Sequence, residues 1–138
     1  MQKKTMTRKE KDRLIEKVSG LLGEKEHILF AYLFGSFVTS ESFQDIDIAV
    51  YVRDGARSVA LELDIERDIE NALQMQVDVR IINNAPLSFI YNVLKNKILA
   101  VDRDKAFRAD FEGLIYKEYF DYLHLRKEYL REILNAPV

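Results

Sequence analysis

Four segments of the chain place apolar residues three and four positions apart, the spacing that lines one side of a helix. They cover residues 8–22, 57–73, 86–94 and 104–134. The first follows Thr7 and contains Glu10, which fits a capping box in which each side chain accepts a hydrogen bond from the other residue's backbone amide. The third opens at Pro86, whose fixed φ suits the first turn of a helix. We therefore predict four helices, of which the last is the longest.

Four shorter segments are almost continuously apolar and contain many aromatic and branched residues, which is typical of strands buried on both faces. They cover residues 27–34, 46–52, 76–82 and 98–101. The dipeptide Asp54-Gly55, after the second of them, has the chemistry of a turn. The predicted order α-β-β-α-β-α-β-α indicates an α/β or α+β fold in which helices flank one small sheet of about four strands.

Composition limits the classes of protein to which the chain can belong. With 138 residues we expect a single domain, residues 1–138, with a helix at 8–22, a sheet region at 27–101 and a helix at 104–134. A net charge of −2 argues against bulk binding to nucleic acid. No apolar run approaches the roughly 20 residues that span a bilayer. The absence of cysteine excludes disulfides and suits a cytoplasmic protein.

Two features of the chain have an open interpretation. Residues 1–13 have a net charge of +4, so the remaining residues carry −6. This basic start could be a docking arm, although a solvated tail is the more usual meaning of such a charge run. The aromatic residues of the last predicted helix could face a partner or could cover the sheet. Four of them are tyrosines: Tyr116, Tyr119, Tyr122 and Tyr129.

Three aspartates occur where the pattern predicts strands. Asp45 and Asp47 are two positions apart and share one face of the second strand, where their charges repel and are costly to desolvate. Asp78 lies on the polar face of the third strand and meets the other two if these strands are neighbours. A bound divalent cation is the usual compensation, and Mg²⁺ prefers carboxylate oxygens. The three side chains therefore predict a site for two metal ions that supports phosphoryl or nucleotidyl transfer.

The dipeptide Gly35-Ser36, directly after the first strand, predicts a cradle for phosphate. Glycine lets the backbone approach an anion closely, a short helix start offers free amides, and the serine hydroxyl can add a hydrogen bond. Each part also has a purely structural interpretation. The dipeptide can be an ordinary turn, Asp45 can belong to the preceding loop, and Asp78 can pair with Arg80 or Lys97. The order of the parts along the chain favours the metal site.

In this order of motifs the chain resembles the minimal nucleotidyltransferases of the DNA polymerase beta superfamily, and among them the MNT antitoxins that are partners of HEPN toxins. The matching segments are Leu33-Phe34-Gly35-Ser36, Asp45-Ile46-Asp47-Ile48-Ala49-Val50, Val77-Asp78-Val79, Asn84-Ala85-Pro86-Leu87 and the long final helix. The resemblance implies a nucleotidyltransferase fold with a small mixed sheet. It also implies transfer of AMP from ATP to a tyrosine of a HEPN ribonuclease toxin.

The resemblance further implies roles for individual residues. Asp45, Asp47 and Asp78 would bind two Mg²⁺ ions, and Asp78 is also a candidate acceptor of the tyrosine hydroxyl proton. Gly35 and Ser36 would hold the triphosphate of ATP.

The family often carries an arginine shortly after the glycine–serine pair, and this chain has none there. Thr39 and Ser40 offer hydroxyl groups to the nucleotide instead. As an alternative to catalysis, a weak or inactive enzyme would neutralise the toxin by binding alone. We expect either a homodimer or a hetero-oligomer with the toxin.

Overall fold

A mixed sheet of four strands forms the centre of the computed structural model, which describes residues 3–53 and 58–135. Its strands, in the spatial order β5-β4-β2-β6, are β2 (Ile28–Phe34), β4 (Ile46–Val52), β5 (Val77–Ile81) and β6 (Ile98–Asp102). β2 is antiparallel to β4 and to β6, whereas β5 is parallel to β4. The prediction of an α/β fold with about four strands is confirmed.

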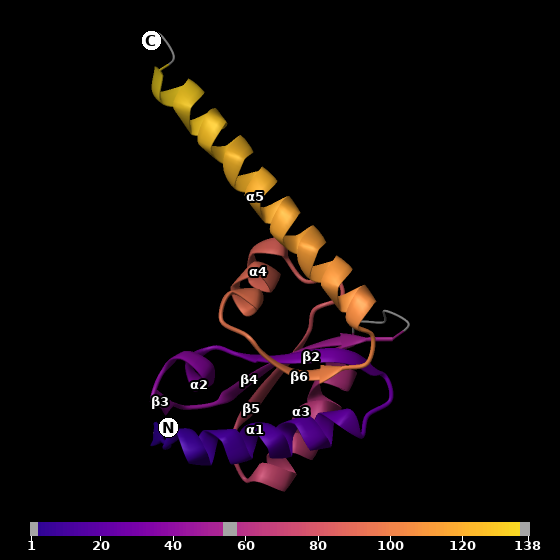
Figure 1. The fold of residues 1–138 in the computed structure, drawn as a ribbon. Coiled ribbons are helices and arrows are strands. Elements are labelled where there is room, and N and C mark those ends of the chain that lie inside the picture. Colours follow the sequence, from indigo (N-terminus) through magenta and orange to yellow (C-terminus); the bar gives the residue numbers. More distant parts are fainter. Residues whose placement is uncertain (1–2, 54–57, 136–138) are drawn as a thin grey trace.

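Helices cover both faces of this sheet (Figure 1). α1 (Arg8–Gly23) and α3 (Val59–Leu73) pack on one face, and α4 (Leu87–Lys95) and the first turns of α5 (Lys105–Asn135) pack on the other. α5 continues well beyond the sheet, and nearly all of its residues 121–135 are exposed. None of the described helices is both long enough and apolar enough to cross a membrane.

Alternation along β4 determines the chemistry of the two faces of the sheet. Ile46, Ile48 and Val50 are fully buried in the core that contains α1 and α3. Ala49 and Tyr51 belong to the opposite core, together with residues of α4 and α5. Because successive side chains of a strand point to opposite faces, Asp47 lies on the α4 and α5 face, near the beginning of β4.

The helices and strands begin and end close to their predicted positions. The four sheet strands and the helices α1, α4 and α5 differ from their predicted ranges by at most one residue at each end. The capping box is present: the Thr7 amide donates to Glu10 Oε1 over 3.1 Å and the Glu10 amide donates to Thr7 Oγ1 over 3.2 Å. The predicted turn at Asp54-Gly55 and residue 57 of the second predicted helix lie outside the described residues.

Three short elements complete the fold. β1 (Lys4–Thr5) pairs antiparallel with β3 (Ser42–Phe43), and neither was predicted because two residues show no periodicity. α2 (Ser36–Thr39) is the short helix expected after Gly35. The basic start is not a free tail: Lys4 and Thr5 are paired with β3 and Lys11 is partly buried, although residues 7–10 are exposed to solvent.

Two of the four tyrosines of α5 pack on α4, which neither interpretation named, and the other two are exposed. Tyr116 is half-buried, and its hydroxyl donates to the Leu94 carbonyl over 3.3 Å. Tyr119 stacks on Tyr91 of α4, with ring centroids 3.8 Å apart. Tyr122 and Tyr129 are exposed. The first two cover α4, and only the last two remain on the surface.

Candidate active site

The parallel pairing of β4 and β5 brings the predicted acidic residues to one edge of the sheet. Asp47 of β4 lies directly opposite Asp78 of β5 in the strand register. Asp45 lies in the bend just before β4, as the loop interpretation expected, rather than within the strand. Asp47 and Asp78 are partly buried. Asp45 directly precedes the first residue of β4. The strands are thus neighbours, which was the condition for the three side chains to meet.

Gly35 joins β2 to α2 and lies against the carboxylate of Asp47. Its backbone has φ 77° and ψ −159°, a region that is almost restricted to glycine. A Cβ atom at this position would overlap Asp47 Oδ2 and lie 3.1 Å from Asp47 Cγ. The residue before it, Phe34, is paired with Asp47 in the register of β2 and β4. The predicted phosphate segment and the predicted metal ligands therefore come into direct contact at Gly35 and Asp47.

Asp47 carries an unfavourable negative charge in this position. Burial is the largest cause that raises its pKa from the ordinary 3.8 to about 6, followed by repulsion from Asp45 and Asp78, while Arg80 acts in the opposite direction. A divalent cation would relieve this repulsion, and carboxylate oxygens are the donors that Mg²⁺ prefers. The donor chemistry of these residues therefore suits Mg²⁺, which Asp45, Asp47 and Asp78 would hold.

Asp78 also has the ion-pair partner that the structural interpretation named. Arg80 Nε lies 3.3 Å from Asp78 Oδ1, and both side chains are partly exposed. Within residues 3–53 and 58–135, no three His, Cys, Asp or Glu side chains are placed to hold one ion together. A shared ion would thus require these side chains to turn toward each other, and Asp78 to loosen its contact with Arg80.

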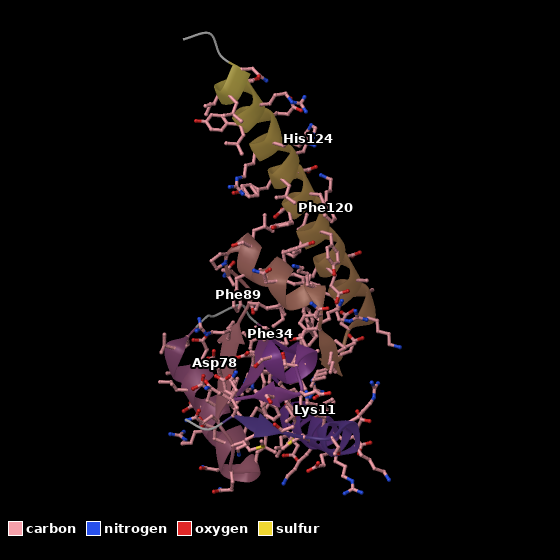
Figure 2. The ribbon with its side chains drawn as sticks, turned by 90° about the vertical axis from the view of Figure 1, so that its left-hand side faces the viewer. Lys11, Phe34, Asp78, Phe89, Phe120 and His124 are labelled. Carbon is pink, nitrogen blue, oxygen red and sulfur yellow. The ribbon has the colours of Figure 1, made fainter. Side chains whose placement is uncertain are left out.

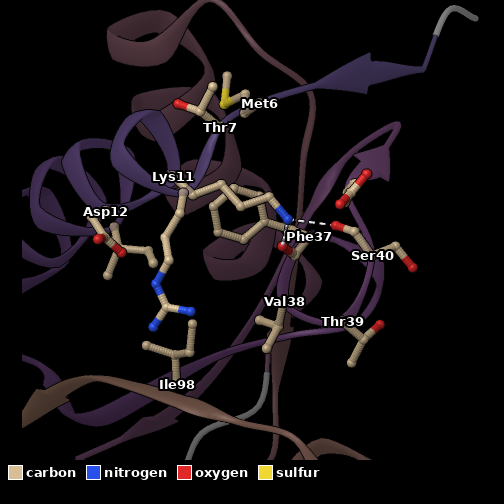
Figure 3. Close-up of a pocket in the computed structure, with 12 residues that line it drawn as sticks. Met6, Thr7, Lys11, Asp12, Phe37, Val38, Thr39, Ser40 and Ile98 are labelled. Carbon is tan, nitrogen blue, oxygen red and sulfur yellow. Dashed lines mark hydrogen bonds between the residues drawn. The ribbon is translucent and has the colours of Figure 1, made fainter.

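The predicted hydroxyl groups lie along α2. Ser36 follows Gly35 directly, and Thr39 Oγ1 donates to the Gly35 carbonyl over 3.2 Å. Thr39 and Ser40 line a cavity of about 420 Å³ between α1 and α2 (Figure 3). None of the three aspartates lines that cavity. The structure therefore brings Gly35 to the acidic edge, with Ser36 next to it in the chain, whereas Thr39 and Ser40 line a separate cavity.

Two glutamates of α3, Glu62 and Glu66, were missed by the sequence analysis. Glu66 Oε1 accepts the Val79 amide over 2.8 Å, and Glu62 Oε2 accepts the Ile81 amide over 2.8 Å. Burial raises the pKa of Glu66, the bond from Val79 lowers it, and the nearby charge of Asp78 raises it. Their spacing of four on an apolar helix side was the available signal. Glu66 thus adds a fourth carboxylate beside Asp78.

An aromatic pair lies on the same face of the sheet as the aspartates. The rings of Phe34, at the end of β2, and Phe89 of α4 meet edge to face with centroids 5.8 Å apart. Figure 2 shows both rings between Asp78 and the rest of α4. The acidic edge is therefore bordered by α2 on one side and by an apolar surface on the other.

The family model described as "Polymerase beta, Nucleotidyltransferase" matches residues 16–106. This range contains the acidic edge and the Gly35-Ser36 segment. The chain belongs to the polymerase beta nucleotidyltransferase family. No curated protein is significantly similar to it in sequence.

Solved structures with the same fold come from toxin–antitoxin pairs. A chain from a mutant of the toxin–antitoxin MntA–HpeT has a TM-score of 0.70 and 20% identity, with 86% of this chain and 95% of that chain covered. A chain from the tri-AMPylated Shewanella oneidensis HEPN toxin in complex with MNT antitoxin has a TM-score of 0.64 and 23% identity, covering 91% and 98%. A toxin–antitoxin structure with AMP-PNP gives 0.65 and 17%, covering 93% and 99%. At these identities the likeness shows the nucleotidyltransferase fold.

Proposed function

We propose that this nucleotidyltransferase is an antitoxin that transfers AMP from ATP to a tyrosine of a cognate HEPN toxin, in a reaction that depends on Mg²⁺. The contact between Gly35 and Asp47, with Asp78 in register beside it, carries the proposal. This contact places the backbone of Gly35, which has no side chain, beside carboxylates whose negative charge is not balanced. A nucleoside triphosphate with its metal ions needs both on the same site.

The chemistry assigns a role to each of these residues, and two roles to Asp78. The tyrosine oxygen forms a bond to the α-phosphorus of ATP, the bond from this phosphorus to pyrophosphate breaks, and Asp78 accepts the hydroxyl proton. Gly35 leaves room for the triphosphate beside Asp47, and the Ser36 hydroxyl donates to a phosphate oxygen. Mg²⁺, when held by Asp45, Asp47 and Asp78, supplies stabilisation of the attacking oxygen and the leaving pyrophosphate.

The choice of acceptor rests on the structural relatives. One of them is an MNT antitoxin in complex with an AMPylated HEPN toxin, and another is a toxin–antitoxin with AMP-PNP. These chains are covered almost completely by the present one. They support a protein, rather than a small molecule, as the acceptor of AMP, and a tyrosine of that protein is part of the proposal.

The proposal is tested by incubating the purified chain with its cognate HEPN toxin, Mg²⁺ and ATP labelled on the α-phosphate. We expect label on the toxin, a mass increase of one AMP on a tyrosine, and no reaction in EDTA. The double variant Asp45→Asn with Asp47→Asn should lose transfer, whereas Asp64→Asn, an exposed aspartate of α3, should retain it. Full labelling by the double variant would contradict the proposal.

A second candidate function is neutralisation of the toxin by binding alone. The Asp78–Arg80 ion pair favours it, together with the missing arginine after Gly35-Ser36. In that case the double variant would still protect cells from the toxin, and mass spectrometry would find no AMP adduct on toxin recovered from cells that contain the unaltered chain. The two functions therefore give opposite results in the same experiment.

A further inference from the structure

The N-terminal segment from Lys4 to Lys11, here called the N-terminal strap, lies along the segment that joins Gly35 to Asp45. Its first residues form β1, which pairs with β3 in the register Lys4 to Phe43 and Thr5 to Ser42. The Thr5 and Ser42 hydroxyl oxygens are 3.1 Å apart. The capping box at Thr7 then turns the strap into α1. The connection from α2 to the acidic edge is thus held from one side by the start of the chain.

Lys11 provides the strongest contact between the strap and this connection. Its ammonium group donates to the Phe37 carbonyl over 2.6 Å and also to the Ser40 carbonyl (Figure 3). The last carbonyls of a helix have no partner within the helix, and Lys11 bonds two such groups at the end of α2. Hydrogen bonds from an ionised donor are about twice as strong as neutral ones.

Two buried aromatic rings fix the position of the Lys11 ammonium. The nitrogen lies 5.2 Å from the ring centroid of Phe37 and 5.5 Å from that of Phe43. The two rings are packed edge to face with centroids 4.9 Å apart, and both side chains are almost fully buried. A cation at this distance is attracted to the face of an aromatic ring. Lys11 therefore ties together α2, β3 and α1.

We propose that Lys11 is a positioning residue that fixes the segment 36–43, and through it the ATP-binding site, for the proposed transfer reaction. This segment lies between Gly35 and Asp45, two residues of the candidate site. The contacts of Lys11 that hold α2 therefore also limit the motion of these two residues. Lys11 binds backbone carbonyls rather than the reactants. The inference rests on the proposed function for its kinetic part, and its structural part can be measured without nucleotide.

Hydrogen exchange of the full chain, followed by mass spectrometry, tests the structural part. In Lys11→Met, we expect peptides that cover residues 36–43 to exchange about tenfold faster, because two charge-assisted hydrogen bonds are lost. Peptides of α3 and β5 should be unchanged. Lys11→Arg, which keeps a cationic donor, should restore most of the protection. Lys9→Met removes an exposed lysine of the same helix and should have no effect.

The kinetic part is tested with the cognate toxin and ATP. Lys11→Met should raise KM for ATP about tenfold and leave KM for the toxin unchanged, with recovery in Lys11→Arg. A lysine that only stabilised the fold would lower the active fraction, and hence kcat, at unchanged KM for ATP. That result would overturn the inference.

The two parts separate a failure of this inference from a failure of the proposed function. Absence of any AMP transfer by the unaltered chain would contradict the proposed function, and the exchange experiment would then decide the role of Lys11 alone. Unchanged exchange of residues 36–43 in Lys11→Met, at an unchanged melting temperature, would overturn the inference whatever the activity. If Lys11→Met does not fold, equal exchange in Lys11→Arg and Lys11→Gln would overturn it.

Discussion

At Gly35, a hydrogen atom in place of a side chain allows the backbone to lie against a carboxylate. This position requires glycine for two independent reasons. Its φ is 77°, and any Cβ atom would overlap Asp47 Oδ2. One reason is backbone strain, and the other is steric overlap. The consequence is that Gly35 sets both the conformation of the turn and the place of Asp47.

Gly35→Ala should lower the free energy of unfolding by about 1–3 kcal/mol and abolish nucleotide transfer, because the turn must change and Asp47 must move. Urea unfolding followed by circular dichroism measures the first effect, and the labelling reaction measures the second. Gly113→Ala is the matched control, since its Cβ would meet open space within α5. There alanine should stabilise the helix, by up to about 1 kcal/mol. Equal losses in both variants would contradict this argument.

The raised pKa of Asp47 predicts a pH-dependent cost of folding in the absence of metal. A carboxyl group whose pKa is raised in the folded state binds its proton more tightly there. The cost of ionising it is therefore absent below the ordinary value of 3.8 and complete above about 6. Asp47→Asn removes this cost. In EDTA at pH 8 the variant should be more stable by about 1 kcal/mol, after allowance for solvent screening of this half-exposed group.

The gain in stability from Asp47→Asn should disappear in acid, and Mg²⁺ should stabilise the unaltered protein but not the variant. Near pH 3.5 the two proteins should have nearly equal melting temperatures, since Asp47 is then largely protonated in both the folded and the unfolded chain. Mg²⁺ should raise the melting temperature of the unaltered protein and leave that of the variant nearly unchanged. A variant that is less stable at pH 8 in EDTA would contradict the assignment of an unbalanced charge.

At the scale of single elements, α3 supplies the hydrogen-bond acceptors that the edge strand β5 lacks. Glu62 is 8% exposed and accepts the Ile81 amide. Glu62→Ala would leave that buried amide without a partner, so we expect a loss of about 1–3 kcal/mol in urea unfolding. Glu62→Gln keeps an acceptor and should lose less. Asp64→Ala, at an exposed position of the same helix, should change stability by less than about 0.5 kcal/mol. A loss in Asp64→Ala as large as that in Glu62→Ala would indicate a general effect on α3.

The longer helices and strands could be predicted from the sequence because each is long enough for its hydrophobic pattern to be recognised. α1 begins after a capping box, and β4 is a run of seven residues with a clear buried side. β1 and β3 could not be predicted, since each has two residues and exists only through its partner. The contacts of Lys11 depend on which backbone groups the fold leaves unpaired, and no local pattern records this. For Glu62 and Glu66, the spacing of four indicates a shared side of the helix but not the β5 amides from which they accept hydrogen bonds.

The candidate site was predictable in its composition and less so in its geometry. The alternation in β4 and the parallel neighbour β5 place Asp47 and Asp78 together as the pattern suggested. Asp45 lies in a bend and Asp78 pairs with Arg80, two alternatives that the residue pattern already named. That Thr39 and Ser40 line a cavity without the three aspartates follows from the path of the chain around α2, which no local pattern records. That path depends on the strap, which the sequence pattern did not reveal.

At the scale of the whole molecule, a buried polar network fastens α5 to the sheet. Arg108 lies 3.0 Å from Asp102 of β6 and 3.1 Å from Glu112, and the Tyr32 hydroxyl of β2 donates to Glu112 over 2.7 Å. The three charged side chains are between 12% and 18% exposed. The bond to Asp102 is the main cause that raises the pKa of Arg108, so this side chain remains charged.

Arg108→Met should lower the free energy of unfolding by about 3 kcal/mol, because it leaves the partly buried carboxylate of Asp102 without its cation and leaves Glu112 with only Lys97, 4.0 Å away. Guanidinium unfolding monitored by circular dichroism gives the value. Lys117→Met breaks an exposed ion pair with Asp121 in the same helix and should cost less than about 0.5 kcal/mol. Similar losses in the two variants would show that the network contributes no more than a surface pair.

The two carboxylates of α3 also restrict how this molecule can assemble. Strands at the border of a sheet commonly recruit a strand from another chain, because their outward amides offer free hydrogen bonds. In β5 the amides of Val79 and Ile81 are already taken by Glu66 and Glu62. A foreign strand would have to displace both side chains and leave their charges without donors. Growth of the sheet across this border into intermolecular β-structure is thereby disfavoured.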